Sequence, residues 1–311
     1  MRNFEKPLQK SLANFESFGK LYFTPKQLFY EFCRNQSSPI GLEAKTAVTF
    51  FGLSAIPTMI FAKSKPKNAL GLLTASAFAL SALAISKQIP RTLSPPIAWN
   101  EFQENLLDYL KNNEISGLLK IKKDVKFADK IPDDLTLYGL PKLLICERCE
   151  IAQMLRLNQF HLQTPCAVLS LREVSPLSEN VQKMLLSAEE PQVFFLHDAS
   201  SQAFVLIPKL RQILALKAEI PLRPLGLRPV HARHLHLFAQ RNVNFSPNTN
   251  FAEIDYLDES EKTWLKNGFT AEVSAVSPVR LLRVLRRLIL GWEIPTSSFQ
   301  NILPQKNLGF M

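Results

Sequence analysis

The hydrophobic pattern sets a central apolar stretch apart from the rest of the chain. Residues 46–62 and 69–86 form two uncharged runs, and the interval between Glu43 and Glu101 contains no acidic residue. As helices, these runs would each cover roughly 26 Å, close to the ~30 Å hydrocarbon core of a bilayer. The pattern therefore predicts a two-helix transmembrane hairpin. Its short connecting loop contains three lysines, namely Lys63, Lys65 and Lys67.

A buried helical hairpin in a soluble core is the alternative interpretation. A core helix usually shows a polar stripe toward solvent, whereas these runs offer only Ser and Thr. The absence of charge therefore favours the membrane interpretation. Two spans place both termini on one side of the bilayer, but the lysines and arginines that flank the runs are too evenly divided to orient the hairpin.

After the hairpin, the pattern changes to short apolar runs that alternate with helical periodicity. Such alternation is typical of βαβ units, and it predicts an open, mainly parallel α/β sheet. The runs that indicate strands are 142–146, 166–171, 192–196 and a fourth near 220–225. The segments with helical spacing are 98–112, 150–160, 178–188 and 200–216.

These patterns divide the chain into three parts. Residues 1–45 form an N-terminal arm, 46–86 the hairpin, and 98–311 the α/β domain. A cleanly delimited helix is predicted at 278–290, with Ser277 as cap, Pro278 at the first helical position and Gly291 after the end. Its arginines, Arg280, Arg283, Arg286 and Arg287, are expected on one side. The expected opposite side consists of Val284, Leu285, Leu288 and Trp292.

The net charge of +10 suggests nucleic-acid binding at first sight, but its distribution does not. Residues 44–100 contribute six basic residues and no acid, which leaves only +4 for the remainder. Basic residues beside a bilayer are expected to contact anionic lipid headgroups, and the arginine-rich helix would serve the same purpose. The lipid bilayer and its anionic headgroups are therefore the expected partners. An unidentified protein partner is also expected, and nucleic acid is not favoured.

Cysteine and histidine add little chemistry. The pair Cys146 and Cys149 forms a single CxxC, which lacks the second pair that a structural zinc site needs. His231, His234 and His236 lie close in sequence, but three convergent ligands are not evident. Nothing suggests a secreted disulfide framework, so the α/β domain is expected on the cytoplasmic side of the membrane.

Two acids follow the ends of predicted strands, the edge where function resides in open α/β sheets. Glu147 follows the first strand in the segment LLICERCEIAQML, and Asp198 follows the third in VFFLHDASS. This layout resembles the Toprim fold of topoisomerases, primases and nucleases, in which a strand ending in Glu precedes one ending in Asp-x-Asp. The resemblance implies that Glu147 and Asp198 are catalytic acids that hold Mg²⁺. Ser200 occupies the position of the family's second Asp.

The N-terminal arm extends the resemblance. The segment from Tyr22 to Tyr30, YFTPKQLFY, is similar to the helix of the topoisomerase VI A subunit that presents a nucleophilic tyrosine. The similarity implies that Tyr30 is the nucleophile, with Lys26 in place of the family's arginine. Only about fifteen residues separate Tyr30 from the hairpin, so the family's winged helix is truncated.

Two functions follow as hypotheses. The first is a membrane-tethered, non-catalytic scaffold or interaction protein with a degenerate Toprim-like domain and no cofactor. The second is a Mg²⁺-dependent enzyme or binder that acts on nucleic acid or phosphate esters through Glu147 and Asp198. The two hypotheses differ in whether these carboxylates converge on one ion.

Overall fold

The computed structural model describes residues 2–36, 93–120, 140–174, 177, 179–241, 254 and 256–291. Residues 1–33 and 92–311 form one compact unit, and 34–91 form a second. The hairpin segments at 46–62 and 69–86, with Lys63, Lys65 and Lys67, lie outside the described residues. Within the described ranges, no helix is both long enough and apolar enough to cross a bilayer.

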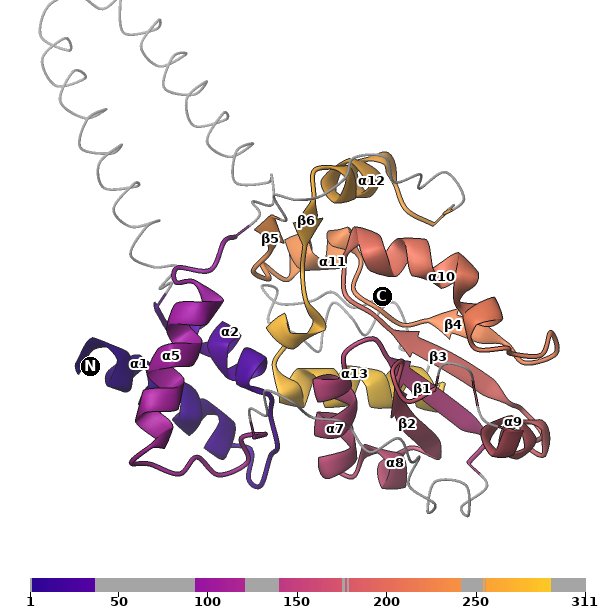
Figure 1. Cartoon of the computed structure of the whole chain (residues 1–311), viewed down its shortest axis with the longest axis horizontal. Helices are drawn as coiled ribbons and strands as arrows, with labels where there is room; N and C mark the ends of the chain where they lie inside the picture. Colours follow the sequence, from indigo (N-terminus) through magenta and orange to yellow (C-terminus); the bar gives the residue numbers. More distant parts are fainter. Residues whose placement is uncertain are drawn as a thin grey trace, which may run out of the picture. The chain divides into compact units, whose positions relative to one another are not determined.

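The centre of the first unit is a four-stranded parallel sheet in the order β2-β1-β3-β4 (Figure 1). It confirms the predicted α/β class. Its strands are β1 (Lys142–Cys146), β2 (Cys166–Ser170), β3 (Gln192–Leu196) and β4 (Leu222–Pro224). Leu144 of β1 pairs with Val168 on one side and with Phe194 on the other. Because β1 and β3 are parallel neighbours, the residues that follow them emerge side by side at one edge.

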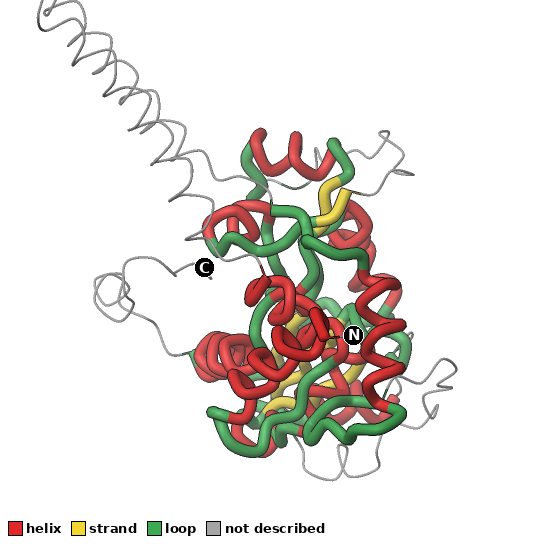
Figure 2. Tube along the Cα trace, turned by 90° about the vertical axis from the view of Figure 1, so that its left-hand side faces the viewer, coloured by secondary structure: helices red, strands yellow, loops and turns green. Residues whose placement is uncertain are grey.

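Both faces of the sheet are buried at β1, β2 and β3, as continuous apolar strands require, whereas the edge strand β4 is largely exposed. Leu144 and Cys146 of β1 face one apolar core, while Leu143 and Ile145 face another. In Figure 2 the strands of this sheet lie among helices. The crossover helices are α7 (Cys149–Leu157), the short α8 (Phe160–Gln163), α9 (Glu179–Leu186) and α10 (Ser201–Ile213).

Three helices around the N-terminal arm share an aromatic cluster. They are α1 (Arg2–Glu16), α2 (Pro25–Gln36) and α5 (Trp99–Leu110). Phe29 of α2 meets Trp99 and Phe102 of α5 edge-on, with ring centroids 5.4 and 5.3 Å apart. The arm also joins the α/β domain, because Asn158 at the end of α7 bonds both backbone groups of Tyr22. The arm is thus part of the same folded unit as the sheet.

The C-terminal part contributes buried residues to one of these apolar cores. It consists of α11 (Pro229–His234), β5 (Gln240–Arg241), α12 (Glu259–Lys266), β6 (Phe269–Thr270), the 3₁₀ turn η1 (Val273–Ala275) and α13 (Pro278–Leu290). An antiparallel bridge between Ala199 and Ala271 connects the end of β3 to this region. It brings the segment that leads into η1 next to the carboxyl edge of the sheet.

Helix α13 has the predicted bounds, but its buried face differs from the one expected. Leu281, Leu285 and Ile289 are buried in the core, whereas Leu288 is 39% exposed. The expected apolar side was therefore wrong at Leu288, and Trp292 lies outside the described residues. Residues 281, 285 and 289 recur every four positions, which places them on one side of the helix.

Candidate functional site

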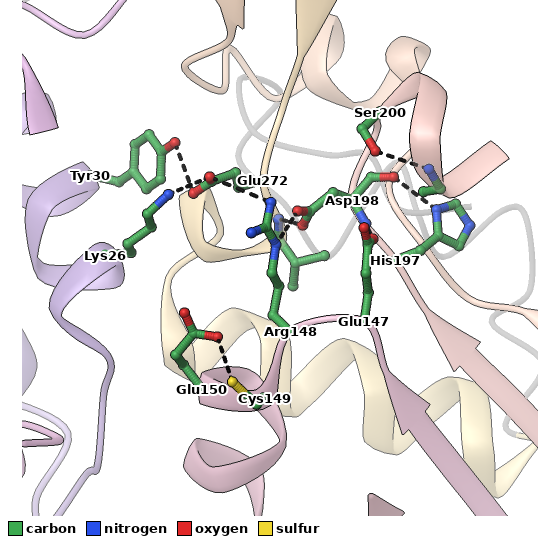
Figure 3. A network of polar contacts seen from close by, with 12 residues as sticks. Lys26, Tyr30, Glu147, Arg148, Cys149, Glu150, His197, Asp198, Ser200 and Glu272 are labelled. Carbon is green, nitrogen blue, oxygen red and sulfur yellow. Dashed lines mark hydrogen bonds and ion pairs between the residues drawn. The ribbon is translucent and has the colours of Figure 1, made fainter. Parts of the chain in front are cut away.

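Glu147 and Asp198 lie next to each other at the carboxyl edge of the sheet, as the strand order requires. The backbone N–H of Asp198 donates to Glu147 Oε2 at 2.8 Å. The backbone N–H of Glu147 in turn donates to the carbonyl of Leu196 at 2.9 Å, which continues the β1–β3 pairing. The two acids predicted from the sequence are therefore brought together by the backbone of two neighbouring strands (Figure 3).

The Asp198 carboxylate is fully buried, and both of its oxygens are engaged. Arg148 Nε donates to Oδ2 at 2.7 Å, and the backbone N–H of Val273 donates to Oδ1 at 2.7 Å. Arg148 follows Glu147 directly in sequence and precedes α7. The end of β1 therefore provides both the acid Glu147 and the counter-ion of Asp198, the acid that follows β3. The charge of Asp198 is therefore balanced by the guanidinium group of Arg148.

A third acid, Glu272, completes the site, and it was not identified from the sequence. Its carboxylate lies between the sheet and the arm, as Figure 3 shows. Lys26 forms an ion pair with Oε1, Arg148 Nη2 lies 3.7 Å from the same oxygen, and the Tyr30 hydroxyl donates to Oε2 at 3.2 Å. Lys26 and Tyr30 both belong to α2. The network therefore connects the N-terminal arm to the carboxyl edge of the sheet.

Glu272 is placed by a contact between segments distant in the chain. The Ala199–Ala271 bridge, with backbone hydrogen bonds of 2.9 and 3.0 Å, sets Glu272 beside the end of β3. The available signal in the sequence was a single acid inside the otherwise uncharged segment from Thr270 to Val276. Such an isolated acid in a buried segment requires a partner, although the sequence does not name it.

Burial shifts the acid–base equilibria of this site. It raises the pKa of Glu147 to about 7, and the neighbouring Asp198 carboxylate adds to the rise. Burial also raises the pKa of Asp198, while Arg148 opposes that shift. Burial, reinforced by Glu272, raises the pKa of the Tyr30 phenol far above its ordinary value. Tyr30 is therefore held as a neutral hydrogen-bond donor, the opposite of an activated nucleophile.

The donor set does not suit Mg²⁺, which the Toprim resemblance implies. Mg²⁺ requires carboxylate oxygens that are free to enter its octahedral shell. Both oxygens of Asp198 and both of Glu272 already accept bonds from side chains or backbone of this chain. Among the described residues, no group of three or more His, Cys, Asp or Glu side chains is arranged to hold a metal ion.

Ser200, at the family's second acid position, has a structural role. It is the N-cap of α10, and its Oγ accepts from the backbone N–H of Ala203 at 3.2 Å. Ser is a preferred N-cap residue because its oxygen satisfies a free N–H of the first turn. The residue immediately before Asp198 is equally structural: His197 is 2% exposed, and burial lowers its pKa to about 4.

The cysteine and histidine motifs do not form sites. Cys146 is buried and Cys149 partly so; both are free thiols, and burial raises the pKa of each. His231 is buried and accepts the backbone N–H of Arg228 at 3.2 Å, whereas His234 is exposed. Neither arrangement brings ligands together around a common point.

The fold and this site together define an α/β protein with a neutralised acidic cluster at the carboxyl edge of a parallel sheet. Comparison with protein-family models, curated proteins and solved structures gives no match to this chain.

Proposed function

We propose that this protein is a membrane-tethered, non-catalytic scaffold or interaction protein whose α/β domain is a degenerate Toprim-like domain. The observation that supports the proposal most is the internal neutralisation of the acidic cluster. Arg148 is paired with Asp198, and Lys26 is paired with Glu272. Arg148 and Lys26 thus bind the carboxylate oxygens that a metal-dependent enzyme would keep free for its metal ion.

The topology supports the Toprim-like part of the proposal. Glu147 follows β1 and Asp198 follows β3, and these two strands are adjacent in the sheet. The departures from the family's pattern support loss of catalysis. Ser200 replaces an acid with a helix cap, and Tyr30 donates a hydrogen bond to a carboxylate from a buried position.

The membrane tether is supported by the two apolar runs at 46–62 and 69–86, which are uncharged and joined by a basic loop. The cytoplasmic assignment of the α/β domain is supported by its chemistry. Cys33, Cys146, Cys149 and Cys166 are all free thiols, which persist in a reducing compartment.

Titration of the full chain with Mg²⁺ and then Mn²⁺, followed by isothermal calorimetry, tests the non-catalytic assignment. We expect no saturable binding, because the ions would have to displace Arg148 and Lys26 from buried carboxylates. Saturable binding that is lost in Asp198→Asn, together with ion-dependent cleavage of a phosphodiester substrate, would overturn the proposal in favour of the Mg²⁺-dependent enzyme.

A further inference from the structure

Helix α13 is fixed in place by its apolar face and by its C-terminal end. Leu281, Leu285 and Ile289 are at most 2% exposed. Gly291 ends the helix with φ of +68°, and the Lys142 ammonium donates to the carbonyl of Ile289 at 2.6 Å. The orientation of the opposite face is therefore determined by the core.

That opposite face is basic. We call it the α13 arginine face, and it consists of Arg280, Arg283 and Arg287. Residues three and four positions apart are neighbours on a helix surface, so these guanidinium groups lie along one stripe. Arg283 is exposed, and Arg280 and Arg287 are partly exposed. The fourth arginine, Arg286, turns instead toward α8, where it donates to Gln163 Oε1.

The charges of this face work against the stability of the helix. No acidic residue occurs between Pro278 and Leu290, so the arginines repel one another at the spacings of three and four residues. Arg280 also lies in the first turn, where the helix dipole disfavours a cation. No hydrogen bond or ion pair connects the side chain of Arg283 or Arg287 to the rest of the described residues. Arg283 therefore breaks a local rule without compensation, as is expected of residues at functional surfaces.

Two exposed leucines lie on α13 and on α8, the helix that Arg286 contacts. Leu288 of α13 is 39% exposed, and Leu162 of α8, next to the Gln163 that binds Arg286, is 66% exposed. Arginine binds phosphate groups through paired N–H donors, and leucine gains free energy where it leaves water. A surface that offers both matches the boundary between phosphate headgroups and acyl chains.

We propose that the α13 arginine face docks onto a bilayer that contains anionic phospholipid. The inference rests on the proposed membrane tether, which would hold the α/β domain near such a surface. Each arginine close to an anionic bilayer contributes about 1 kcal/mol, which corresponds to a roughly fivefold change in equilibrium. Docking would bring the α/β domain down onto the membrane in one defined orientation.

Residue-resolved modification of arginine by phenylglyoxal tests this proposal. The full chain is reconstituted into bilayers of phosphatidylcholine alone and into equimolar phosphatidylcholine and phosphatidylserine, and modification rates are read by mass spectrometry. We expect Arg283 and Arg287 to react about fivefold more slowly in the anionic bilayers, with the protection reversed by high salt. Arg172 and Arg223, which are exposed outside α13, should react equally in both.

Two double variants with equal charge loss complete the test. In Arg283→Gln/Arg287→Gln, the protection of Arg280 should disappear, whereas Arg172→Gln/Arg223→Gln should retain it. Neither variant should melt below the parent chain, because the first removes repulsion within α13 and the second changes exposed positions. Equal reactivity in the two bilayers, or equal protection of Arg172 and Arg223, would overturn the proposal. Protection by duplex DNA but not by phosphatidylserine would overturn it in favour of nucleic acid.

If residues 46–86 do not tether the chain to a membrane, the reconstitution itself shows it. In that case the chain would not be recovered in phosphatidylcholine bilayers at all. Phosphatidylserine vesicles added to the protein in solution would then protect the α13 arginine face if the present inference holds, and would leave it reactive if the inference is wrong.

Discussion

Asp198 has no exposed surface, and its carboxylate receives one bond from Arg148 and one from the N–H of Val273. Removing a carboxylate from water costs several kcal/mol, and this cost is recovered only when the charge is paired and hydrogen-bonded. The pairing explains why an acid can be buried at the end of β3. The bonds from Arg148 and Val273 also favour the charged form of Asp198, against the rise in pKa that burial causes.

Replacing Arg148 with Met would leave Asp198 without its counter-ion. Breaking a buried ion pair from one side typically costs 3–5 kcal/mol. Because the Arg148 side chain is 41% exposed, we expect a smaller loss of about 2 kcal/mol in the free energy of unfolding, measured by urea denaturation. Arg172→Met, at an exposed position, is the matched control and should change stability little.

A double-mutant cycle separates the ion pair from the loss of packing. In Asp198→Asn the side-chain oxygen still accepts from Val273, while the negative charge is gone. Adding Arg148→Met to this variant should cost distinctly less than adding it to the parent. Equal costs in the two backgrounds would contradict the assigned pairing.

Glu147 makes the stability of the fold depend on pH. Its pKa is raised from 4.5 to about 7 on folding, so the folded state binds the proton more tightly than the unfolded state. The stabilisation is complete below pH 4.5 and is lost as the pH rises through about 7. Glu147→Gln cannot ionise, yet it keeps an oxygen for the N–H of Asp198.

We therefore expect Glu147→Gln to gain stability over the parent chain as the pH rises. The gain should begin near pH 4.5 and level off above about 7, reaching about 3 kcal/mol at most. Melting temperatures of both proteins across this range measure the difference, and comparing them cancels the opposing contribution of His197, whose pKa is lowered. A difference that does not vary with pH would show that folding does not raise the pKa of Glu147.

At the scale of elements, local patterns predicted what the structure confirmed. The strands β1 and β3 and the helix α13 have the predicted bounds. The strands are delimited by their apolar runs, and α13 by Pro278 at its start and Gly291 after its end, although Ser277 makes no side-chain capping bond. The helix α1 was not predicted, because its apolar positions gain a partner only when the arm packs against α5. The parallel sheet followed from the alternation of runs with helices.

The site was only half predictable for the same reason. Glu147 and Asp198 follow strands, so their meeting at one edge depends only on which strands are neighbours. Glu272 and the contacts of α2 depend on pairing between segments about 70 and 240 residues apart, as in the Ala199–Ala271 bridge and the Tyr30–Glu272 bond. No periodicity within a segment encodes such contacts. The sequence therefore predicted Glu147 and Asp198, but neither Glu272 nor the pairing of Arg148 and Lys26 with the buried carboxylates.

The attachment of α2 to the site can be measured with Tyr30→Phe. This change removes only the hydroxyl that donates to Glu272 Oε2, while Lys26 still holds the other oxygen. We expect a loss of about 1 kcal/mol in the free energy of unfolding, the usual value of one buried hydrogen bond. Tyr109→Phe on α5, whose hydroxyl bonds no other described residue, should lose less. Equal losses would mean that the Tyr30 hydroxyl does not stabilise the attachment.

At the scale of the whole molecule, the first unit is built from two segments that are not consecutive in the sequence. Residues 1–33 and 92–311 form one compact unit, although 58 residues, 34–91, separate them in sequence. Insertions of this kind are tolerated when the parent domain keeps its own core. The aromatic cluster of α1, α2 and α5 and the Glu272 network both lie within the first unit, so its stability should not require the inserted segment.

Replacing residues 37–91 with a flexible Gly/Ser linker, which leaves α2 whole, tests both this organisation and the proposed tether. The shortened protein should fold cooperatively and appear in the supernatant after cell fractionation, whereas the full chain should stay with the membranes after a carbonate wash. A control that keeps 46–86 and exchanges only Lys63, Lys65 and Lys67 for Gln should remain membrane-bound, because apolar length rather than loop charge drives insertion. A shortened protein that still sediments with the membranes would place the attachment outside the hairpin. A full chain in the supernatant would make 46–86 part of a soluble core, because two uncharged runs of this length need either lipid or protein around them.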